Sequence, residues 1–261
     1  PAVGTEPVPT PALRPVIAGT GLGLVVAMAS EAKLLSRGPL QPGQSRLLAP
    51  GVRLLLSGMG EQAAGHAARQ LVNEGVEALA VIGVAGGLDP DYPAGSVICA
   101  SEICTTDGQR HPTDAAWRQA LHLATRGQCR VAPLLGSAVA LSTPVAKHDA
   151  ASRHGAVAVD MESGAVAAVA AAHDKPLLVL RAIADEAGDI LPEVLQHAVD
   201  PLGQPRPWPM LVTLLRHPGL ITVLPGLARR MQAATRGLQQ IIAQTGPDLA
   251  WSRRQHALRG G

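Results

Sequence analysis

The chain has 261 residues, of which 47% are hydrophobic and 16% charged, and its net charge is +2. A chain of this length and composition can bury a large core, and its dispersed, nearly balanced charges argue against nucleic-acid binding. The three cysteines form no CxxC pair and no apolar run reaches the roughly 18 residues of a membrane span, so we expect no disulfide, no metal site and no transmembrane helix. Because the proline-rich first residues lack the pattern of an export signal, a cytoplasmic location is expected.

Predicted strands and helices alternate along the chain. Short apolar runs, typical of strands buried on both faces of a parallel sheet, alternate with segments of helical spacing. The predicted strands are Leu22–Met28, Val52–Leu56, Ala78–Val84, Ser96–Thr105, Val131–Leu141, Val157–Val159 and Leu177–Ile183. The predicted helices are Ser30–Ser36, Glu61–Glu74, Thr113–Arg126, Pro144–Arg153 and Glu162–His173. This alternation predicts an α/β fold.

The composition changes near Asp200, where the breaker-rich sequence PLGQPRPWP begins. Leucines at helical spacing predict a helical segment over Met210–Ile242, and the residues after about Thr245 are predicted to form a frayed tail. The predicted helical segment is aliphatic with interspersed arginines, which suits a lipid-bearing substrate or peripheral contact with a membrane; packing on the core or on a neighbouring subunit explains the same pattern. The predicted divisions are a flexible segment (1–20), an α/β domain (21–199), a helical extension (200–245) and a tail (246–261).

Two glycine turns are predicted at the ends of neighbouring strands, SGMG at residues 57–60 and GVAGG at residues 83–87. Ligands bind at the carboxyl ends of parallel strands, where backbone N–H groups are unpaired, so the turns predict two walls of a pocket. With Ala63 the first turn also fits a loose dinucleotide fingerprint, which makes a dinucleotide-binding oxidoreductase an alternative. The second strand, however, ends in glycines instead of an acidic ribose-binding residue.

Acidic residues follow two further predicted strands, Asp160 and Glu162 in DMES and Asp185 in RAIAD. A role for Asp160 as helix cap explains one acid and leaves Glu162 free to point into a pocket. Partial burial would raise the pKa of Asp185 and suit it to act as a general acid.

Taken together, these motifs resemble the purine nucleoside phosphorylase and nucleosidase superfamily, most closely its methylthioadenosine/S-adenosylhomocysteine nucleosidase-like branch. The resemblance covers about residues 22–191. The DMESGAVA motif and the C-terminal sequence LLRHPGLITVLPGLARR also resemble the hopanoid-associated phosphorylase subgroup, whose proposed task is to remove adenine from adenosylhopane. The resemblance implies a single-domain, three-layer α/β/α fold with a central mixed, mostly parallel sheet, and a homo-oligomer that binds a small-molecule nucleoside.

The resemblance also implies a role for each site residue. Asp185 matches the donor of a proton to the leaving purine, and Glu31 matches the acid that activates the attacking water. Substrate contacts are implied for Glu162 at the ribose hydroxyls, for Met161 beneath the sugar, and on the sugar and nucleophile side for Ser57, Gly58, Gly60, Ala85 and Gly86. No cofactor and no metal are implied, and phosphate is a candidate co-substrate.

Some positions depart from the superfamily's pattern and leave the reaction open. Val81 and Val84 stand where phosphorylases carry the arginine and serine that bind phosphate, so the residues favour hydrolysis, whereas the subgroup favours phosphorolysis. Arg53 and Lys33 are candidates for the missing positive charge.

Base recognition also departs from the superfamily's pattern. Ala184 replaces a serine that helps to orient the aspartate, and the base-stacking aromatic has no counterpart, so the backbone of residues 139–143 would hold the purine. A non-catalytic nucleoside-binding relative is a further alternative, although the chain retains all three acids of the motif, Glu31, Glu162 and Asp185.

Overall fold

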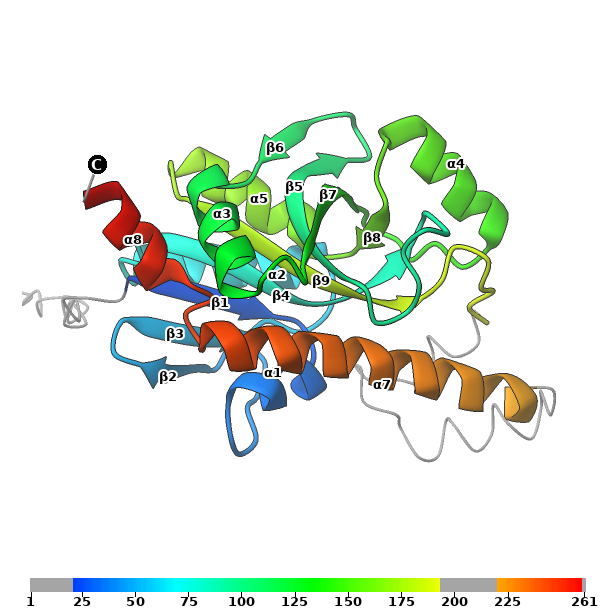
Figure 1. The fold of residues 1–261 in the computed structure, drawn as a ribbon, viewed down its shortest axis with the longest axis horizontal. Coiled ribbons are helices and arrows are strands. Elements are labelled where there is room, and N and C mark those ends of the chain that lie inside the picture. Colours follow the sequence, from blue (N-terminus) through cyan, green and yellow to red (C-terminus); the bar gives the residue numbers. More distant parts are fainter. Residues whose placement is uncertain (1–20, 193–219, 260–261) are drawn as a thin grey trace, which may run out of the picture.

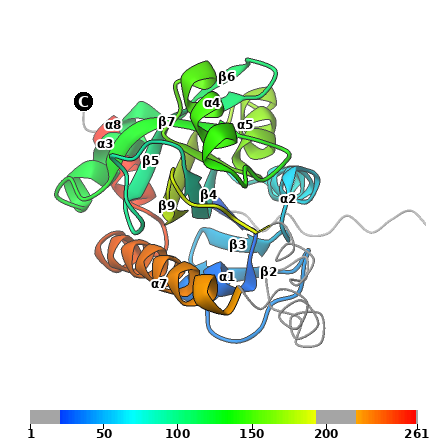
Figure 2. The ribbon, with the colours of Figure 1, turned by 90° about the vertical axis from the view of Figure 1, so that its right-hand side faces the viewer.

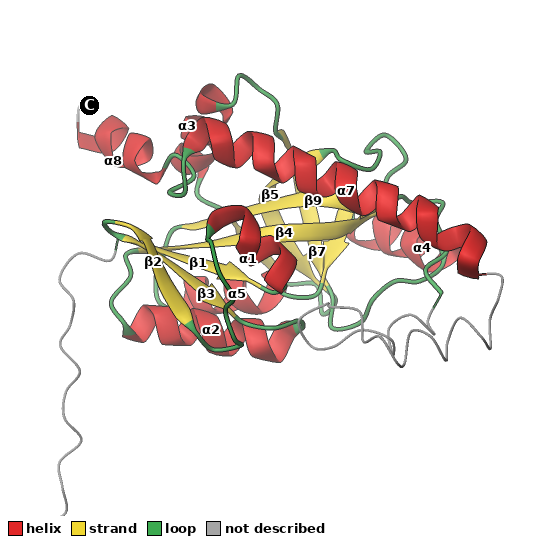
Figure 3. Cartoon of the chain, turned by 90° about the horizontal axis from the view of Figure 1, so that it is seen from below, coloured by secondary structure: helices red, strands yellow, loops and turns green. Residues whose placement is uncertain are grey.

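The computed structural model describes residues 21–192 and 220–259. They form a mixed β-sheet between two layers of helices, as Figures 1 and 3 show, which confirms the predicted three-layer α/β/α fold. Within these residues no helix is both long and apolar enough to cross a membrane. The predicted flexible segment 1–20 and the first part of the predicted extension, up to residue 219, lie outside the described residues.

The sheet of the described residues has nine strands. They are β1 (Leu22–Val26), β2 (Ser45–Ala49), β3 (Val52–Leu56), β4 (Ala78–Gly87), β5 (Val97–Thr105), β6 (Arg110–Pro112), β7 (Arg130–Gly136), β8 (Ala158–Asp160) and β9 (Leu177–Asp185). Their order is β2-β3-β1-β4-β8-β7-β5-β6, and β9 pairs with both β4 and β5. Because β9 joins β4 to β5 while β8 joins β4 to β7, these five strands close into a ring. This curled half of the sheet brings the carboxyl ends of β4, β8 and β9 together.

Helices cover both faces of the sheet. They are α1 (Ala29–Leu35), α2 (Glu61–Asn73), α3 (Ala115–Ala124), α4 (Pro144–His154), α5 (Ser163–Ala172), α7 (Leu220–Thr245) and α8 (Trp251–Arg259). Side chains of β1 alternate between the two faces, as a pleated strand requires. Leu24 and Val26 pack in a core shared with α1, α3, α7 and α8, whereas Val25 packs in a core shared with α2 and α5. In Figure 2, α1 and α7 lie side by side on the first of these faces.

A close approach of two backbone segments, at the end of β7 and in the first turn of α5, fixes where α5 starts. A Cβ atom at Gly136, the last residue of β7, would lie 2.7 Å from the backbone nitrogen of Gly164 in α5. Since real Cβ atoms do not approach backbone this closely, only glycine allows β7 and α5 to meet here. The contact sets the position of Glu162, which directly precedes α5.

Several predicted elements differ from the structure. The edge strands β2 and β6 were not predicted, because β2 is only half-buried and β6 has three residues, so neither has a clear hydrophobic period. The predicted strand over Val131–Leu141 ends at Gly136. Helix α7 continues through Pro225, which lies near its start.

The prediction of a frayed tail after Thr245 was wrong, because residues 251–259 form helix α8. Trp251 of this helix is buried, and the indole of Trp117 donates a hydrogen bond of 2.7 Å to the carbonyl of Leu249. Long-range burial of tryptophan therefore orders a segment whose local sequence is polar.

Candidate active site

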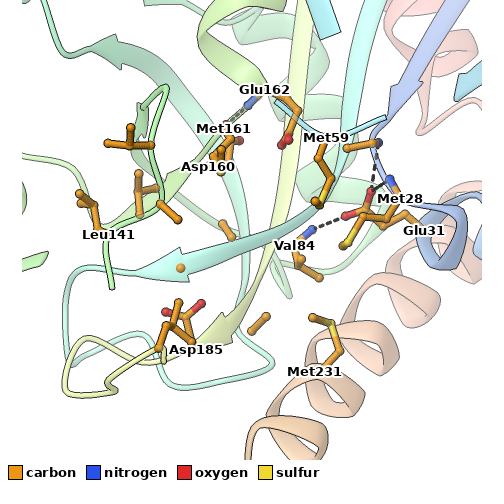
Figure 4. Close-up of a pocket in the computed structure, with 18 of the residues that line it drawn as sticks. Met28, Glu31, Met59, Val84, Leu141, Asp160, Met161, Glu162, Asp185 and Met231 are labelled. Atoms are coloured by element: carbon orange, nitrogen blue, oxygen red, sulfur yellow. Dashed lines mark hydrogen bonds between the residues drawn. The ribbon is translucent and has the colours of Figure 1, made fainter. Parts of the chain in front are cut away.

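A cavity of about 350 Å³ opens at the carboxyl ends of β1, β4, β8 and β9 (Figure 4). Its volume lies within the range of small-molecule sites, roughly 300–1,000 Å³. Four acids line it, namely Glu31, Asp160, Glu162 and Asp185. Helix α7 contributes Leu227 and Met231 to the wall. The sheet order thus brings together residues that are more than 150 positions apart in the sequence.

Glu31 lies in the first turn of α1, immediately after β1, and is 3% exposed. One carboxylate oxygen accepts hydrogen bonds from the backbone nitrogens of Ala27 and Met28, at 3.1 and 2.9 Å. The other accepts from the backbone nitrogen of Val84, at 2.9 Å. Burial raises the pKa of Glu31 from 4.5 to about 7, although Arg181 and the backbone N–H groups oppose the rise. The group can therefore exchange a proton near neutral pH.

Arg181 is the central cation of the site. It stands in the middle of β9, is 1% exposed, and was not singled out in the sequence. Its Nε atom lies 2.5 Å from Asp160 Oδ2, and its Nη2 atom lies 3.1 Å from Glu162 Oε2. A Cβ at Gly83 would lie 2.2 Å from Arg181 Nη1 and 2.5 Å from Glu31 Oε1, so this glycine leaves room for both groups. One guanidinium is thus surrounded by three carboxyl groups.

The two acids at the end of β8 have different tasks. Asp160 accepts hydrogen bonds from the backbone nitrogens of Glu162 and Ser163, at 3.0 and 2.8 Å, and from the Ser163 hydroxyl. It therefore holds the first backbone N–H groups at the start of α5, although the N-cap residue itself is Glu162, and in addition it pairs with Arg181. Glu162 is held by Arg181 and by the backbone nitrogen of Gly60, at 3.0 Å. Burial raises the pKa of Glu162, against the effect of Arg181.

Asp185 ends β9 on a different side of the cavity from Glu31 (Figure 4). Burial raises the pKa of its carboxyl group, although Lys147 opposes the rise. The Lys147 ammonium lies 2.5 Å from Asp185 Oδ2. A Cβ at Gly86 would lie 3.1 Å from the same oxygen, so this glycine gives the carboxyl group room.

The other predicted contact residues fall into two groups. Met161, Ala85 and Gly86 line the cavity together with the acids. Ser57, Gly58 and Gly60 are not among its lining residues. The Ser57 hydroxyl donates to the carbonyls of Val26 and Gly58, and Gly60 instead holds Glu162. The substrate contacts of all six residues stay predictions.

The positions discussed for phosphate bring no cation to the cavity. Val81 is buried in the core, and Val84 lines the cavity. Arg53 pairs with Glu74 at 3.4 Å, Lys33 is exposed, and neither lines the cavity. Among the described residues, no group of three or more His, Cys, Asp or Glu side chains is placed to hold a metal ion.

Arg181 and Lys147 are the cations at the candidate site that sequence reasoning missed. Arg181 had a signal, because a charged residue inside the apolar run LLVLRAIAD has to be paired when the strand is buried. Lys147 had none, because α4 shows little apolar periodicity and the lysine meets its partner only through the fold.

Comparisons with known proteins agree with this architecture. The family model described as "Phosphorylase superfamily" matches residues 22–202. The methylthioadenosine/S-adenosylhomocysteine nucleosidase of Neisseria meningitidis, in complex with methylthio-immucillin-A, has a TM-score of 0.64 at 18% identity, over 86% of this chain and 97% of that chain. The corresponding nucleosidase of Colwellia psychrerythraea, in complex with adenine, has a TM-score of 0.62 at 17% identity, over 86% and 95%.

The futalosine hydrolase of Helicobacter pylori has a TM-score of 0.60 at 16% identity, over 85% of this chain and 97% of that chain. No curated protein matches the chain. At these identities the solved structures establish the fold, whereas the family model covers well over half of the sequence. The chain belongs to the phosphorylase superfamily.

Proposed function

We propose that the chain hydrolyses the N-glycosidic bond of an adenine nucleoside. The main support is that one cavity presents Asp185, Glu31 and Glu162 from different walls (Figure 4). Cleavage of this bond needs an acid for the leaving base, a base for the nucleophile and negative charge near the ribosyl cation that develops between them. The nucleosidases that share the fold include one in complex with adenine.

In the proposed reaction one carboxyl group donates a proton and a second one accepts a proton. Neutral Asp185 donates its proton to N7 of adenine as the bond between C1′ and N9 breaks and its electrons pass to the purine. Ionised Glu31 accepts a proton from the water whose oxygen bonds to C1′. Glu162, held by Arg181 and Gly60, binds the ribose hydroxyls. Asp185 ends ionised and Glu31 protonated, and exchange with solvent restores both.

The charge of the cavity favours water over phosphate as nucleophile. Among the described residues, the cations that contact its acids are Arg181 and Lys147, and each lies against the side chain of an acid of the site. A phosphate anion would therefore enter a site with four acidic side chains and no cation among its described lining residues. Water faces no such repulsion, and Glu31 has a pKa suited to activating it.

Replacing the base tests this reaction. Glu31→Gln is expected to lower kcat/KM for adenosine and methylthioadenosine, measured without phosphate, roughly 10²–10⁴-fold because an amide cannot accept the proton. In the wild type, Glu31 is expected to produce a break close to pH 7 in the profile of kcat/KM, since only its ionised form acts as a base. The break should vanish in the variant. Release of adenine is followed by chromatography, with Glu77→Gln, an exposed acid, as control.

Two other outcomes would contradict the proposed hydrolysis. If adenine appears only when phosphate is added, and Glu31→Gln keeps that activity, the protein is a phosphorylase and the water-activating role of Glu31 is wrong. If neither adenosine, methylthioadenosine nor adenosylhopane is cleaved under either condition, the non-catalytic alternative stands.

The second part of the proposal concerns the 5′ group of the substrate. Four of the chain's five methionines, Met28, Met59, Met161 and Met231, line the cavity. Methionine side chains fit apolar groups of varied shape, and Leu141, Leu191 and Leu227 extend the apolar wall. With the resemblance to the hopanoid-associated subgroup, this supports adenosylhopane as the natural substrate. Peripheral contact with a membrane and assembly into a homo-oligomer stay predictions.

A series of 5′-alkylthioadenosines tests the apolar wall. Each buried methylene is worth about 0.8 kcal/mol, so kcat/KM is expected to rise roughly fourfold per added carbon from methylthio- to pentylthioadenosine. Adenosine, whose 5′ group is a hydroxyl, serves as the reference. Values that stay flat or fall beyond the methylthio compound would contradict an apolar 5′ site, while leaving the glycosidic reaction itself untouched.

A further inference from the structure

Helix α4 buries a single side chain, and that side chain is a lysine. Lys147 is 0% exposed. Its ammonium group donates to Asp185 Oδ2 at 2.5 Å, to the carbonyl of Glu186 at 2.6 Å and to the carbonyl of Asp189 at 3.4 Å. An ammonium group has three hydrogens, so all of its donors are used. Lys147 therefore has none left for a substrate and can influence one only through Asp185.

We propose that Lys147 is a positioning residue that holds the Asp185 carboxyl group by one oxygen and stabilises the carboxylate formed when its proton is given away. The inference rests on the glycosidic cleavage proposed above. With Oδ2 held by Lys147, no hydrogen bond to Oδ1 is found in the described part of the chain. The geometry thus leaves one oxygen of Asp185 for the purine. In superfamily relatives a serine is expected to orient this aspartate, and Ala184 stands in its place here.

The charges around Asp185 explain what a lysine adds beyond orientation. Burial raises the pKa of Asp185, the Lys147 ammonium lowers it, Asp189 in the following loop raises it, and Arg230 of α7 lowers it. Arg230 is itself paired with Asp189 at 2.9 Å, which leaves Lys147 as the cation in direct contact with Asp185. When the proton passes to N7, the new carboxylate lies against a cation that is already in place. The proton transfer therefore creates no unpaired buried charge.

A purely structural role is the competing explanation, because Lys147 also binds two carbonyls of the loop after β9. That loop has other anchors. The backbone nitrogen of Leu191 donates to the carbonyl of Ser142 at 2.9 Å, and Glu186 accepts from the backbone nitrogen of Ala94 at 3.0 Å. The loop is thus held at both ends without the lysine, and a readout on Asp185 itself can separate the two roles.

The experiment follows the carboxyl carbon of Asp185 by NMR titration of protein labelled with ¹³C-aspartate, with Asp185→Asn identifying the resonance. Lys147→Met removes the charge and the donors, whereas Lys147→Gln removes the charge but keeps two N–H donors. Both variants are expected to raise the pKa of Asp185 by about one unit or more, since an opposite charge in contact lowers a carboxyl pKa by about 1–3 units. Lys175→Met, in the turn before β9, is the control and should leave the titration unchanged.

Kinetics supply the second readout. With methylthioadenosine, both neutral variants are expected to lower kcat about 10–100-fold with little change in KM, because the lysine acts on the proton donor and does not contact the nucleoside. An unchanged Asp185 titration in either folded variant overturns the proposal, and so does a loss confined to KM. The titration needs no substrate. It therefore tests the link between Lys147 and Asp185 even if no nucleoside is cleaved. If nucleosides are cleaved but the titration is unchanged, the role of Lys147 is refuted and the proposed reaction stands.

Discussion

Arg181→Met is expected to lower the free energy of unfolding by about 3–5 kcal/mol at pH 8, because it leaves buried carboxylates without their cation. Asp160 and Glu162 both lose their ion pair, and Glu31 loses its nearest positive charge. Burial already raises the pKa values of Glu31 and Glu162 against the effect of Arg181, so both should rise further in the variant. Protonated acids need no counter-charge, so the loss of stability should shrink as the pH falls from 8 to 5.5. Urea unfolding at the two pH values measures both effects.

A surface pair provides the matched control for Arg181. Arg110 lies 2.5 Å from Glu102, but the two side chains are 52% and 28% exposed. Arg110→Met should therefore cost less than about 1 kcal/mol at either pH. If the two variants lose equal free energy of unfolding, or if the loss for Arg181→Met does not depend on pH, the Arg181 guanidinium does not neutralise the buried carboxylates of the site.

Asp185→Asn is expected to lower kcat for adenine release roughly 10²–10⁴-fold with a small change in KM, because asparagine can hydrogen-bond to the purine but cannot give it a proton. The measurement is steady-state release of adenine from methylthioadenosine. Asp174→Asn, an exposed position with φ of 50° that asparagine tolerates, should have full activity. Full activity of the Asp185→Asn variant would show that Asp185 does not donate the proton.

Loss of the fold has to be separated from loss of the proton donor. Where Asp185 is ionised, its replacement by asparagine takes the counter-ion from the fully buried Lys147 ammonium, so above the pKa of Asp185 the variant should also be less stable. The double variant Lys147→Met/Asp185→Asn removes the unpaired charge and should regain stability in urea unfolding while staying inactive. A double variant that recovered activity would show that the defect of Asp185→Asn lay in the fold.

Much of the fold could be predicted because it depends on local pattern. Short, mostly apolar runs such as 78–84 and 177–183 are typical of strands buried on both faces, and their alternation with helices leads directly to the layered α/β arrangement. The acids of the candidate site were also visible, since Glu31, Glu162 and Asp185 each follow a predicted strand. The edge strands were missed because β2 is only half-buried and β6 has three residues, so neither shows a clear hydrophobic period. Helix α8 was missed because contacts distant in sequence order it, such as the hydrogen bond from Trp117 to the carbonyl of Leu249.

By itself, the sequence determined the layered class of the fold and the three acids at strand ends, because hydrophobic period and strand-end position are properties of neighbouring residues. Only the tertiary structure decided which cation pairs with which acid. Arg181 reaches Asp160 and Glu162 only because β9 lies against β4 in the curled sheet, and Lys147 reaches Asp185 only because the fold brings the first turn of α4 near the end of β9. Charge pairing depends on distances in space, and residues 38 positions apart carry no local signal of a 2.5 Å contact.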